Sequence, residues 1–330
     1  APPIYGVWLY DPRDGTLYVA LMLGHFGCKI HRSTDRGATW EELPAPAYPQ
    51  SDAPDAPALY MIWTIAAGGE DEPGTLWAGT LPGGLFRSDD RGESWRLVES
   101  LWNVPERAKW FGGGYDHPGI HSILVDPRSS NRLTLGVSCG GVWMTEDGGE
   151  TWEQAGHGLR ADFLPPDQAY DPVSQDPHLI AACRMDPDRV WCQHHNGIFM
   201  SKDGGRKFEE FRDVKPSVFG FAVAVHPADP DRAWFAPGVK DECRVPVGGC
   251  LVVTRTSDGG ASFEALGNGL PDRECYDLIY RHALVCDGTG ERLAMGSTTG
   301  NLWASHDGGD SWRMLSGNLP PIAQVAFAAQ

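Results

Sequence analysis

The chain has 330 residues, and 27 lysines and arginines against 44 aspartates and glutamates give it a formal net charge of −17. This length allows two domains or one large all-β domain, and a hydrophobic content of 41% is enough for a sizeable core. An acidic surface repels phosphate polyanions and anionic lipid headgroups, which argues against a nucleic-acid or membrane partner. Any anionic substrate would need a local basic pocket.

The sequence contains no membrane-spanning or secretory segment that we can recognise. No stretch approaches the roughly 18 apolar residues of a spanning helix. The first residues, APPIYGVWLYDPRDG, lack the charged and apolar regions of a signal peptide. We therefore expect a soluble protein and favour the cytoplasm, or a secreted or periplasmic location if a signal was removed before Ala1. The oligomeric state is left open.

In chain order, the first clear feature is a repeated turn signal that occurs six times. The six segments are STDRGATW (33–40), SDDRGESW (88–95), TEDGGETW (145–152), SKDGGRKF (201–208), TSDGGASF (256–263) and SHDGGDSW (305–312). Their aspartates, Asp35, Asp90, Asp147, Asp203, Asp258 and Asp307, are separated by 55, 57, 56, 55 and 49 residues. A regular period of this length indicates a repeat architecture.

The geometry of a tight turn explains the residue type at each position of the repeat. The carboxylate can accept backbone N–H groups inside a tight turn, and the glycine two residues later tolerates a positive φ. We expect these aspartates to be structural and the six terminal aromatic residues to be buried between sheets. Those residues are Trp40, Trp95, Trp152, Phe208, Phe263 and Trp312.

The segments between the turns read as short strands. The third repeat gives IHSILVDP, RLTLGVSCG, GVWMTED and TWEQA, and the fourth and sixth repeats give the same series of four β-rich runs. No helical period of useful length is present. A four-stranded antiparallel sheet that recurs about every 50 residues is typical of a β-propeller blade. We therefore predict an all-β chain in which residues 1–330 form a single β-propeller domain.

The repeated pattern resembles the Asp-box, or bacterial neuraminidase repeat, of sialidase-like propellers, some endoglucanases and sorting-receptor ectodomains. The resemblance covers nearly the whole chain at the level of fold. It implies that each aspartate turn joins the third and fourth strands of a blade, on the face opposite the usual active site. It also implies a sialidase-like activity, but the arginine clamp of sialidases is not found, because the nearest string is Arg244-Val245-Pro246 in the fifth repeat. A fold alone does not fix a chemistry.

The number of blades depends on the C-terminal residues. Residues 322–327 read as one more innermost strand without partners, and an unpaired inner strand would leave backbone groups unsatisfied. We therefore favour seven blades, the last one incomplete in this chain. Six blades with an added C-terminal strand are the alternative.

The loops that precede the first strands and follow the second strands should open on one face, which is the expected pocket. For acid/base or nucleophilic chemistry they offer Tyr115, Asp116, His117, Asp241, Glu242, Tyr276 and Asp277. For substrate binding they offer Trp110, His194, Asn196, Lys240, Arg244 and Arg281. The loop around Lys240 should be the longest on this face. Its cysteines, Cys243 and Cys250, are expected to lie close together and could form a disulfide.

Histidines are frequent in the same loops, and imidazole is a common ligand of transition metals. His25, His121 and His195 come from three different repeats and could hold one divalent transition metal of unknown identity. Our leading hypothesis is an enzyme, a hydrolase or lyase, that acts on a carbohydrate-like or small organic substrate and uses this metal or a histidine-centred acid/base pair. The alternatives are a carboxylate-dependent glycoside hydrolase and a non-catalytic propeller that binds a protein or glycan.

Overall fold

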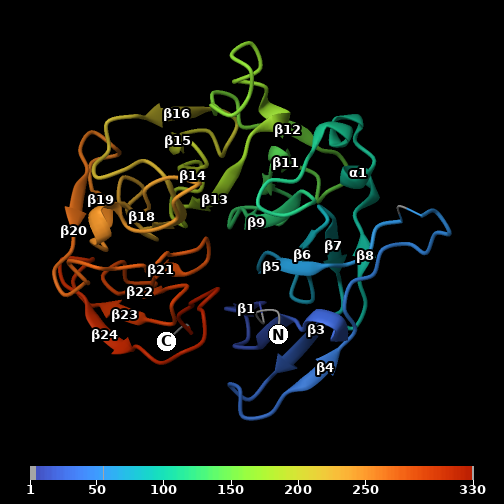
Figure 1. The fold of residues 1–330 in the computed structure, drawn as a ribbon. Helices are drawn as coiled ribbons and strands as arrows, with labels where there is room; N and C mark the ends of the chain where they lie inside the picture. Colours follow the sequence, from blue (N-terminus) through green and yellow to red (C-terminus); the bar gives the residue numbers. More distant parts are fainter. Residues whose placement is uncertain (1–4, 55, 329–330) are drawn as a thin grey trace. The chain divides into compact units, whose positions relative to one another are not determined.

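A computed structural model describes residues 5–54 and 56–328, and in these ranges 24 strands pair into six four-stranded antiparallel sheets (Figure 1). The described residues form an all-β propeller with six blades. Two compact units contain three blades each: among the described residues, unit 1 covers 5–54, 56–155 and 172–176, and unit 2 covers 156–171 and 177–328. In every sheet the four strands follow one another in sequence order, as the repeat predicts.

Unit 1 holds the first three sheets. The strands are β1 (Tyr5–Tyr10), β2 (Leu17–Met22), β3 (Cys28–Ser33) and β4 (Glu41–Leu43); β5 (Met61–Ala67), β6 (Leu76–Leu81), β7 (Leu85–Ser88) and β8 (Arg96–Leu97); and β9 (Gly119–Val125), β10 (Leu133–Ser138), β11 (Gly141–Thr145) and β12 (Glu153–Ala155). Short helices occur in the connections, namely η1 (Gly24–Phe26), α1 (Glu99–Trp102), η2 (Pro105–Lys109) and η3 (Pro172–Ser174).

Unit 2 holds the other three sheets. The strands are β13 (Pro177–Ala182), β14 (Val190–His194), β15 (Gly197–Ser201) and β16 (Phe208–Phe211); β17 (Gly220–Val225), β18 (Ala233–Pro237), β19 (Val253–Thr256) and β20 (Glu264–Leu266); and β21 (Leu284–Cys286), β22 (Leu293–Gly296), β23 (Leu302–Ser305) and β24 (Arg313–Ser316). One short helix, η4 (Val247–Gly249), lies between β18 and β19. No helix in the described ranges has the length and hydropathy needed to cross a bilayer.

The first strand of each sheet is the inner strand of its blade. Within unit 1 the inner strand β5 contacts β1 and β9, and within unit 2 β17 contacts β13 and β21. Middle strands such as β10 and β11 are buried along their whole length. Strands covered on both faces need continuous apolar residues, so the alternation of a half-exposed sheet is absent from them. Trp77, Trp143, Trp191, Trp234 and Trp303 fill the spaces between sheets.

Six blades, and not the favoured seven, are present in the described residues. The C-terminal segment forms no additional sheet: a single parallel bridge joins His282 and Gln324, and the Val325 N–H donates to the His282 carbonyl at 3.0 Å. The Ile322 N–H donates to the Ser297 carbonyl at 2.9 Å. The segment that reads as an unpartnered strand therefore satisfies part of its backbone against the sixth sheet, so a seventh blade is not needed to pair it.

The six aspartate turns all join the third and fourth strands, as predicted. In the first turn, Oδ1 of Asp35 accepts the Ser33 hydroxyl at 2.8 Å and the Thr39 N–H at 2.9 Å, and Oδ2 accepts the Thr39 hydroxyl at 2.6 Å. The Gly37 N–H donates to the Ser33 hydroxyl, and Gly37 adopts a φ of 87°. The other five turns repeat the aspartate bonds, except that Lys207 replaces the second hydroxyl residue in the fourth.

The expected burial of the six turn aromatics is only partly correct. Phe208 and Trp312 are buried, but Trp95, Trp152 and Phe263 are half-buried and Trp40 is 43% exposed. The reason is local, because the Trp40 indole N–H donates to the Gly37 carbonyl of its own turn at 3.1 Å and the ring therefore lies over the turn. The interior position between sheets is taken instead by tryptophans of the middle strands, such as Trp77 and Trp143.

The loop between β18 and β19 follows the second strand of its sheet, so it lies on the side opposite the aspartate turns, as expected. Cys243 and Cys250 are both free thiols in it, so the possible disulfide is not formed. The Cys250 thiol instead contacts the Asp272 carbonyl at 2.9 Å. Whether the two cysteines form a disulfide depends on the direction of their side chains, which their spacing in the sequence cannot give.

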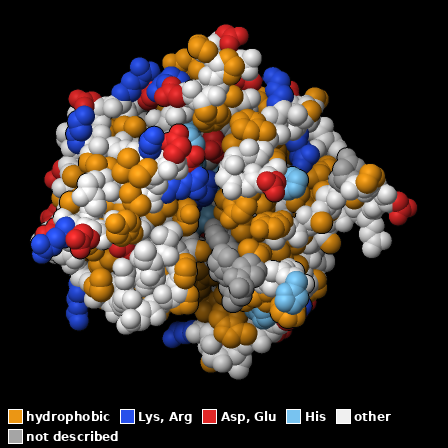
Figure 2. Space-filling model, in the orientation of Figure 1, with side chains coloured by type: hydrophobic (Ala, Val, Ile, Leu, Met, Phe, Trp, Pro, Cys, Tyr) orange, Lys and Arg blue, Asp and Glu red, His pale blue; other side chains and the backbone are white. Residues whose placement is uncertain are grey.

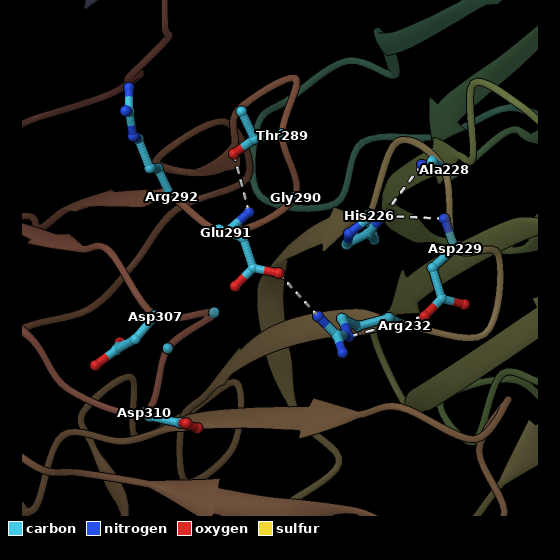
Figure 3. Close-up of polar contacts among 12 residues, drawn as sticks. His226, Ala228, Asp229, Arg232, Thr289, Gly290, Glu291, Arg292, Asp307 and Asp310 are labelled. Carbon is cyan, nitrogen blue, oxygen red and sulfur yellow. Dashed lines mark hydrogen bonds and ion pairs between the residues drawn. The ribbon is translucent and has the colours of Figure 1, made fainter.

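A polar cluster in unit 2 joins the β17–β18 connection to the β21–β22 connection (Figure 3). Nδ1 of His226 accepts the backbone N–H groups of Ala228 and Asp229 at 3.1 and 2.9 Å. Arg232 lies 3.7 Å from a carboxylate oxygen of Glu291. Gly290 has a φ of 83°, and a Cβ built on it would overlap the His226 ring. The cluster therefore requires glycine at position 290 for both backbone conformation and space.

We predict that Gly290→Ala lowers the free energy of unfolding by roughly 2–4 kcal/mol, because a left-handed backbone and a displaced His226 ring add their costs. Gly248→Ala is the matched control, since Gly248 also has a positive φ (64°) but no atom within 4 Å of a built Cβ. It should cost only about 1 kcal/mol. Chemical denaturation measures both, and equal losses would contradict the packing account.

The aspartate turns predict a specific acid sensitivity. Hydrogen bonds from Thr151 and Thr145 lower the pKa of Asp147 to about 2, and those from Thr39 and Ser33 do the same for Asp35. A folded pKa below the unfolded value of about 3.9 means that the stabilisation is complete above that pH and is lost as the pH falls toward 2. Asp147→Asn should therefore make the fall in unfolding free energy between these pH values shallower. Glu150→Gln, in the same turn, should leave the slope as in the wild type, and equal slopes for all three proteins would refute the assignment.

Candidate functional site

Several inner strands carry a β-bulge at a corresponding position. The pairing register skips Trp63 in β5, His121 in β9 and His178 in β13, and in β17 it skips Phe221 and Ala222. A bulge leaves the extra residue outside the regular ladder and re-aims its side chain, and bulges are frequent beside active sites. Aromatic or imidazole rings thus occupy matching positions in four successive blades.

In unit 1 the bulged residues belong to an aromatic cluster. The Trp63 ring lies 5.3 Å from the Tyr115 ring and 5.6 Å from the His121 ring, both in edge contacts. The Tyr60 ring lies 6.0 Å from that of Tyr115 and is 51% exposed. His121 is fully buried, and its Nδ1 lies 2.8 Å from the Ser122 hydroxyl. The cluster therefore runs from a buried imidazole to an exposed tyrosine.

The loop that precedes β9 and carries Tyr115 approaches a buried carboxylate. Asp176 is buried, and its Oδ1 accepts the Ser138 hydroxyl at 3.0 Å and the Cys139 N–H at 3.2 Å. A Cβ built on Gly113 would overlap the Cys139 sulfur and lie 3.8 Å from Oδ2 of Asp176. The glycine run at 112–114 therefore allows a close backbone approach, and it brings the loop that carries Tyr115 and Asp116 to Asp176.

In unit 2 the bulged residues form a second ring cluster. The imidazole of His178 stacks on Phe221 with centroids 4.4 Å apart and planes at 11°, and it lies 5.2 Å from the ring of His195. Nδ1 of His178 lies 2.7 Å from the Gly220 carbonyl oxygen, which can only accept, so Nδ1 carries the proton. His195 in turn contacts Phe163, which is 42% exposed.

Asp277 is enclosed by donors. Its carboxylate accepts Ser297 at 2.6 Å, Asn301 at 2.8 Å and the Cys275 thiol at 3.0 Å, together with the Thr299 hydroxyl. Burial alone raises the pKa of Asp277, but these hydrogen bonds outweigh it and the pKa is lowered. Burial and the bond to Asp277 raise the pKa of Cys275 to about 12. Asp277 therefore suits an ionised positioning role better than that of a general acid.

The charged residues of the β18–β19 loop pair with one another. Arg244 donates to Oδ1 of Asp241 at 3.0 and 2.5 Å, and Nζ of Lys240 lies 3.4 Å from Glu242. A hydrogen bond from its own backbone N–H and the proximity of Lys240 lower the pKa of Glu242. Glu242 is therefore not prepared to donate a proton near neutral pH.

The three histidines predicted to bind a metal lie in different surroundings. His25 is exposed in η1 beside Phe26, and neither it nor His121 belongs to a converging set of three His, Cys, Asp or Glu ligand atoms in the described residues. His195 does have a neighbouring imidazole nitrogen, that of His178, within 4.8 Å. A divalent transition metal at His195 stays a prediction, with His178 as the companion ligand that the sequence interpretation left out.

The remaining predicted residues divide by exposure. Trp110 is buried against Trp143, with ring centroids 5.7 Å apart, so its ring packs in the core and its predicted contact with a substrate gains no support. His194 is also buried, beside Phe199, and Asn196 accepts the Asp162 N–H at 2.7 Å. His117 and Tyr276 are exposed. These last two stay candidates without a contact that assigns a role.

Sequence reasoning assigned no role to Asp176, His178 or Phe221. A signal for two of them was present, because His178 and Phe221 occupy the position that Trp63 and His121 take in the runs MIWTIAA, GIHSILV, PHLIAA and GFAVAV. The bulge at that position is a property of pairing and cannot be read from composition. On the face shown in Figure 2, acidic and basic side chains are interspersed with exposed hydrophobic ones, so no single charged patch marks a site.

Comparison with known proteins supports the fold and points to carbohydrate-active relatives. No family model matches the chain. The chain is 25% identical over 323 residues to the oligoxyloglucan-reducing end-specific xyloglucanase of Emericella nidulans, an alignment that covers 93% of the chain and 33% of that enzyme. It is 24% identical over 249 residues to sortilin of Rattus norvegicus, covering 74% of the chain and 25% of sortilin. The chain thus spans a third or less of the length of these relatives.

Solved structures give the same fold. An ancestral GH74 enzyme superposes with a TM-score of 0.64 at 15% identity, over 92% of this chain and 36% of that one. YCF48 bound to a D1 peptide superposes with a TM-score of 0.58 at 14% identity, over 100% of this chain and 92% of that one. At these identities the likeness shows a β-propeller and no more. The Asp-box resemblance stays an interpretation of the six turns.

Proposed function

We propose that the chain is a carbohydrate-active propeller that binds a neutral glycan at the unit 1 cluster and hydrolyses a glycosidic bond there. The observation that carries the proposal is the exposed aromatic surface formed by Tyr60 and Tyr115 beside Trp63. Sugar rings present apolar C–H faces that pack on aromatic rings, while their hydroxyls bond to nearby polar groups. The similarity to a xyloglucanase over 93% of the chain supports a glycan substrate.

Two carboxylates of unit 1 can perform the chemistry. Hydrolysis of a glycosidic bond needs one carboxyl group that protonates the leaving oxygen and a second that activates water or attacks the sugar. We assign the first role to Asp116, which lies exposed on the loop with Tyr115, and the second to Asp176, whose orientation is held by Ser138 and Cys139. No step of this mechanism requires a metal, and the lyase alternative receives no support from the relatives.

A second candidate function is glycan binding without hydrolysis. It is favoured by the carboxylates of unit 2, where Asp241, Glu242 and Asp277 all pair with cations or hydrogen-bond donors. In this case the protein does not hydrolyse the glycosidic bond, but the aromatic surface still binds the glycan. The two candidates are separated by measuring binding and hydrolysis on the same protein.

We predict that the protein releases reducing ends from xyloglucan oligosaccharides and that Asp176→Asn lowers kcat/KM by about 10³-fold, because the second carboxylate is lost. Tyr60→Ala should instead weaken binding by roughly tenfold, which corresponds to one stacking contact. The measurements are a reducing-end assay and calorimetric titration with the same oligosaccharide.

Matched controls exist for both variants. Asp167→Asn and Tyr170→Ala change an exposed carboxylate and an exposed tyrosine of unit 2 and should behave as the wild type. Binding without hydrolysis in the wild type, reduced by Tyr60→Ala, would establish the non-catalytic candidate in place of the enzyme. If the wild type shows neither binding nor hydrolysis of the oligosaccharide and still has a normal melting transition, the proposed function is overturned.

A further inference from the structure

Two imidazole rings of unit 2 meet where β13 begins. His178 is the bulged residue of β13, and His195 lies in the turn between β14 and β15. Their ring centroids lie 5.2 Å apart, and their ligand nitrogens lie within 4.8 Å of each other. Zn²⁺ binds a histidine nitrogen at about 2.0–2.1 Å, so two such nitrogens on a tetrahedral ion lie roughly 3.3 Å apart. Small side-chain movements are therefore enough to place one ion between the two rings.

The hydrogen bond of His178 gives its ring the tautomer that binds metals. Nδ1 donates to the Gly220 carbonyl at 2.7 Å, so the neutral ring carries its lone pair on Nε2. Metal-binding histidines usually donate their other ring N–H to a carbonyl or carboxylate in this way, which fixes both the tautomer and the orientation of the ring. The Phe221 ring, stacked within 11° of parallel, holds the same imidazole from one face. The ring is therefore oriented before an ion binds.

A carboxylate lies next to His178 along the chain. Asp176 precedes it by two residues, so the short backbone between them keeps the side chains near each other, and a carboxylate oxygen lies within 4.8 Å of the His178 ligand nitrogen. Oδ1 of Asp176 accepts the Ser138 hydroxyl and the Cys139 N–H, which orients the carboxylate. Two imidazoles and one carboxylate are a ligand set for transition metals, whereas Ca²⁺ and Mg²⁺ prefer oxygen ligands.

The surroundings of these side chains suit a cation that enters from the surface. Asp176 and His178 are buried, whereas His195 is half-buried and contacts Phe163, which is 42% exposed. The Phe219 ring lies edge-on to both imidazoles, with centroids 6.0 and 6.1 Å away. Apolar rings lower the local dielectric constant and so strengthen the attraction between a cation and a carboxylate. The net charge of −17 attracts cations to the chain as a whole.

We propose that His178, His195 and Asp176 bind one divalent transition metal ion, with Zn²⁺ as the best match to this ligand set. Three protein ligands leave the fourth tetrahedral position to water or to an oxygen of a bound molecule. The metal site does not rest on the proposed hydrolysis. The two would share Asp176, so a bound ion would hold the carboxylate that the hydrolysis needs and should lower that activity.

Calorimetric titration of the whole, metal-free chain with Zn²⁺ and with Ca²⁺ tests the site. The wild type should bind one Zn²⁺ per chain, and Co²⁺ in its place should show the strong visible absorption of a tetrahedral complex. His195→Gln removes one ligand and should weaken Zn²⁺ binding at least about 100-fold. His306→Gln, which changes an exposed histidine of the sixth aspartate turn, is the matched control and should bind as the wild type. Zn²⁺ should raise the melting temperature of the wild type and the control but not that of His195→Gln.

Three outcomes would overturn the site: no binding of Zn²⁺, as expected if the three side chains only bond to one another; unchanged affinity in His195→Gln; or equal affinity for Ca²⁺, which would mark an unselective acidic surface. If His195→Gln fails to fold, His195→Cys keeps a zinc ligand of another type. That variant should still bind Zn²⁺, and its Co²⁺ complex should gain the near-ultraviolet absorption of a thiolate ligand. Because every readout is metal binding and not product formation, failure of this site is distinguishable from failure of the proposed hydrolysis.

Discussion

The bond network of the aspartate turn is the interaction on which the rest of the structure depends. A single carboxylate accepts a backbone N–H and two hydroxyls, or one hydroxyl in the fourth turn, and thereby closes the connection between the third and fourth strands. Repeated six times, it spaces the sheets along the chain and fixes which strand is outermost. Each turn satisfies its own polar groups. The side of every sheet that carries the aspartate turn is therefore stabilised without any contribution from the candidate-site residues.

The opposite side of each sheet carries the residues of the candidate site. There the inner strands begin, and bulges turn Trp63, His121, His178 and Phe221 out of the regular ladder. The bulged rings have different neighbours: Tyr115 lies beside Trp63 in unit 1, and the ring of His195 and the guanidinium groups of Arg244 and Arg281 lie beside His178 and Phe221 in unit 2. One structural device, repeated in successive blades, thus presents different side chains in the two units.

The sequence predicts the fold well because its signals are local. Each turn needs a carboxylate, a hydroxyl and a glycine at fixed offsets, so the six turns and the four strands of each sheet follow from spacing. What could not be predicted depends on pairing and direction. Whether residues 322–327 form a strand and whether Cys250 meets Cys243 are decided by neighbours farther away in sequence. Whether Trp40 packs inward depends on the direction of its side chain, which bonds to its own turn. Asp176 was assigned no role because no motif marks a carboxylate whose partners come from another strand.

Hydrogen exchange measured by mass spectrometry, with and without a xyloglucan oligosaccharide, tests the central claim that binding belongs to the bulged inner-strand side and stability to the aspartate turns. In unit 1 the account predicts slower exchange on ligand binding in peptides that cover residues 60–64 and 111–121. Exchange in the aspartate turn at residues 145–152 should be unchanged. Protection confined to that turn, with the two inner-strand segments unaffected, would contradict the account.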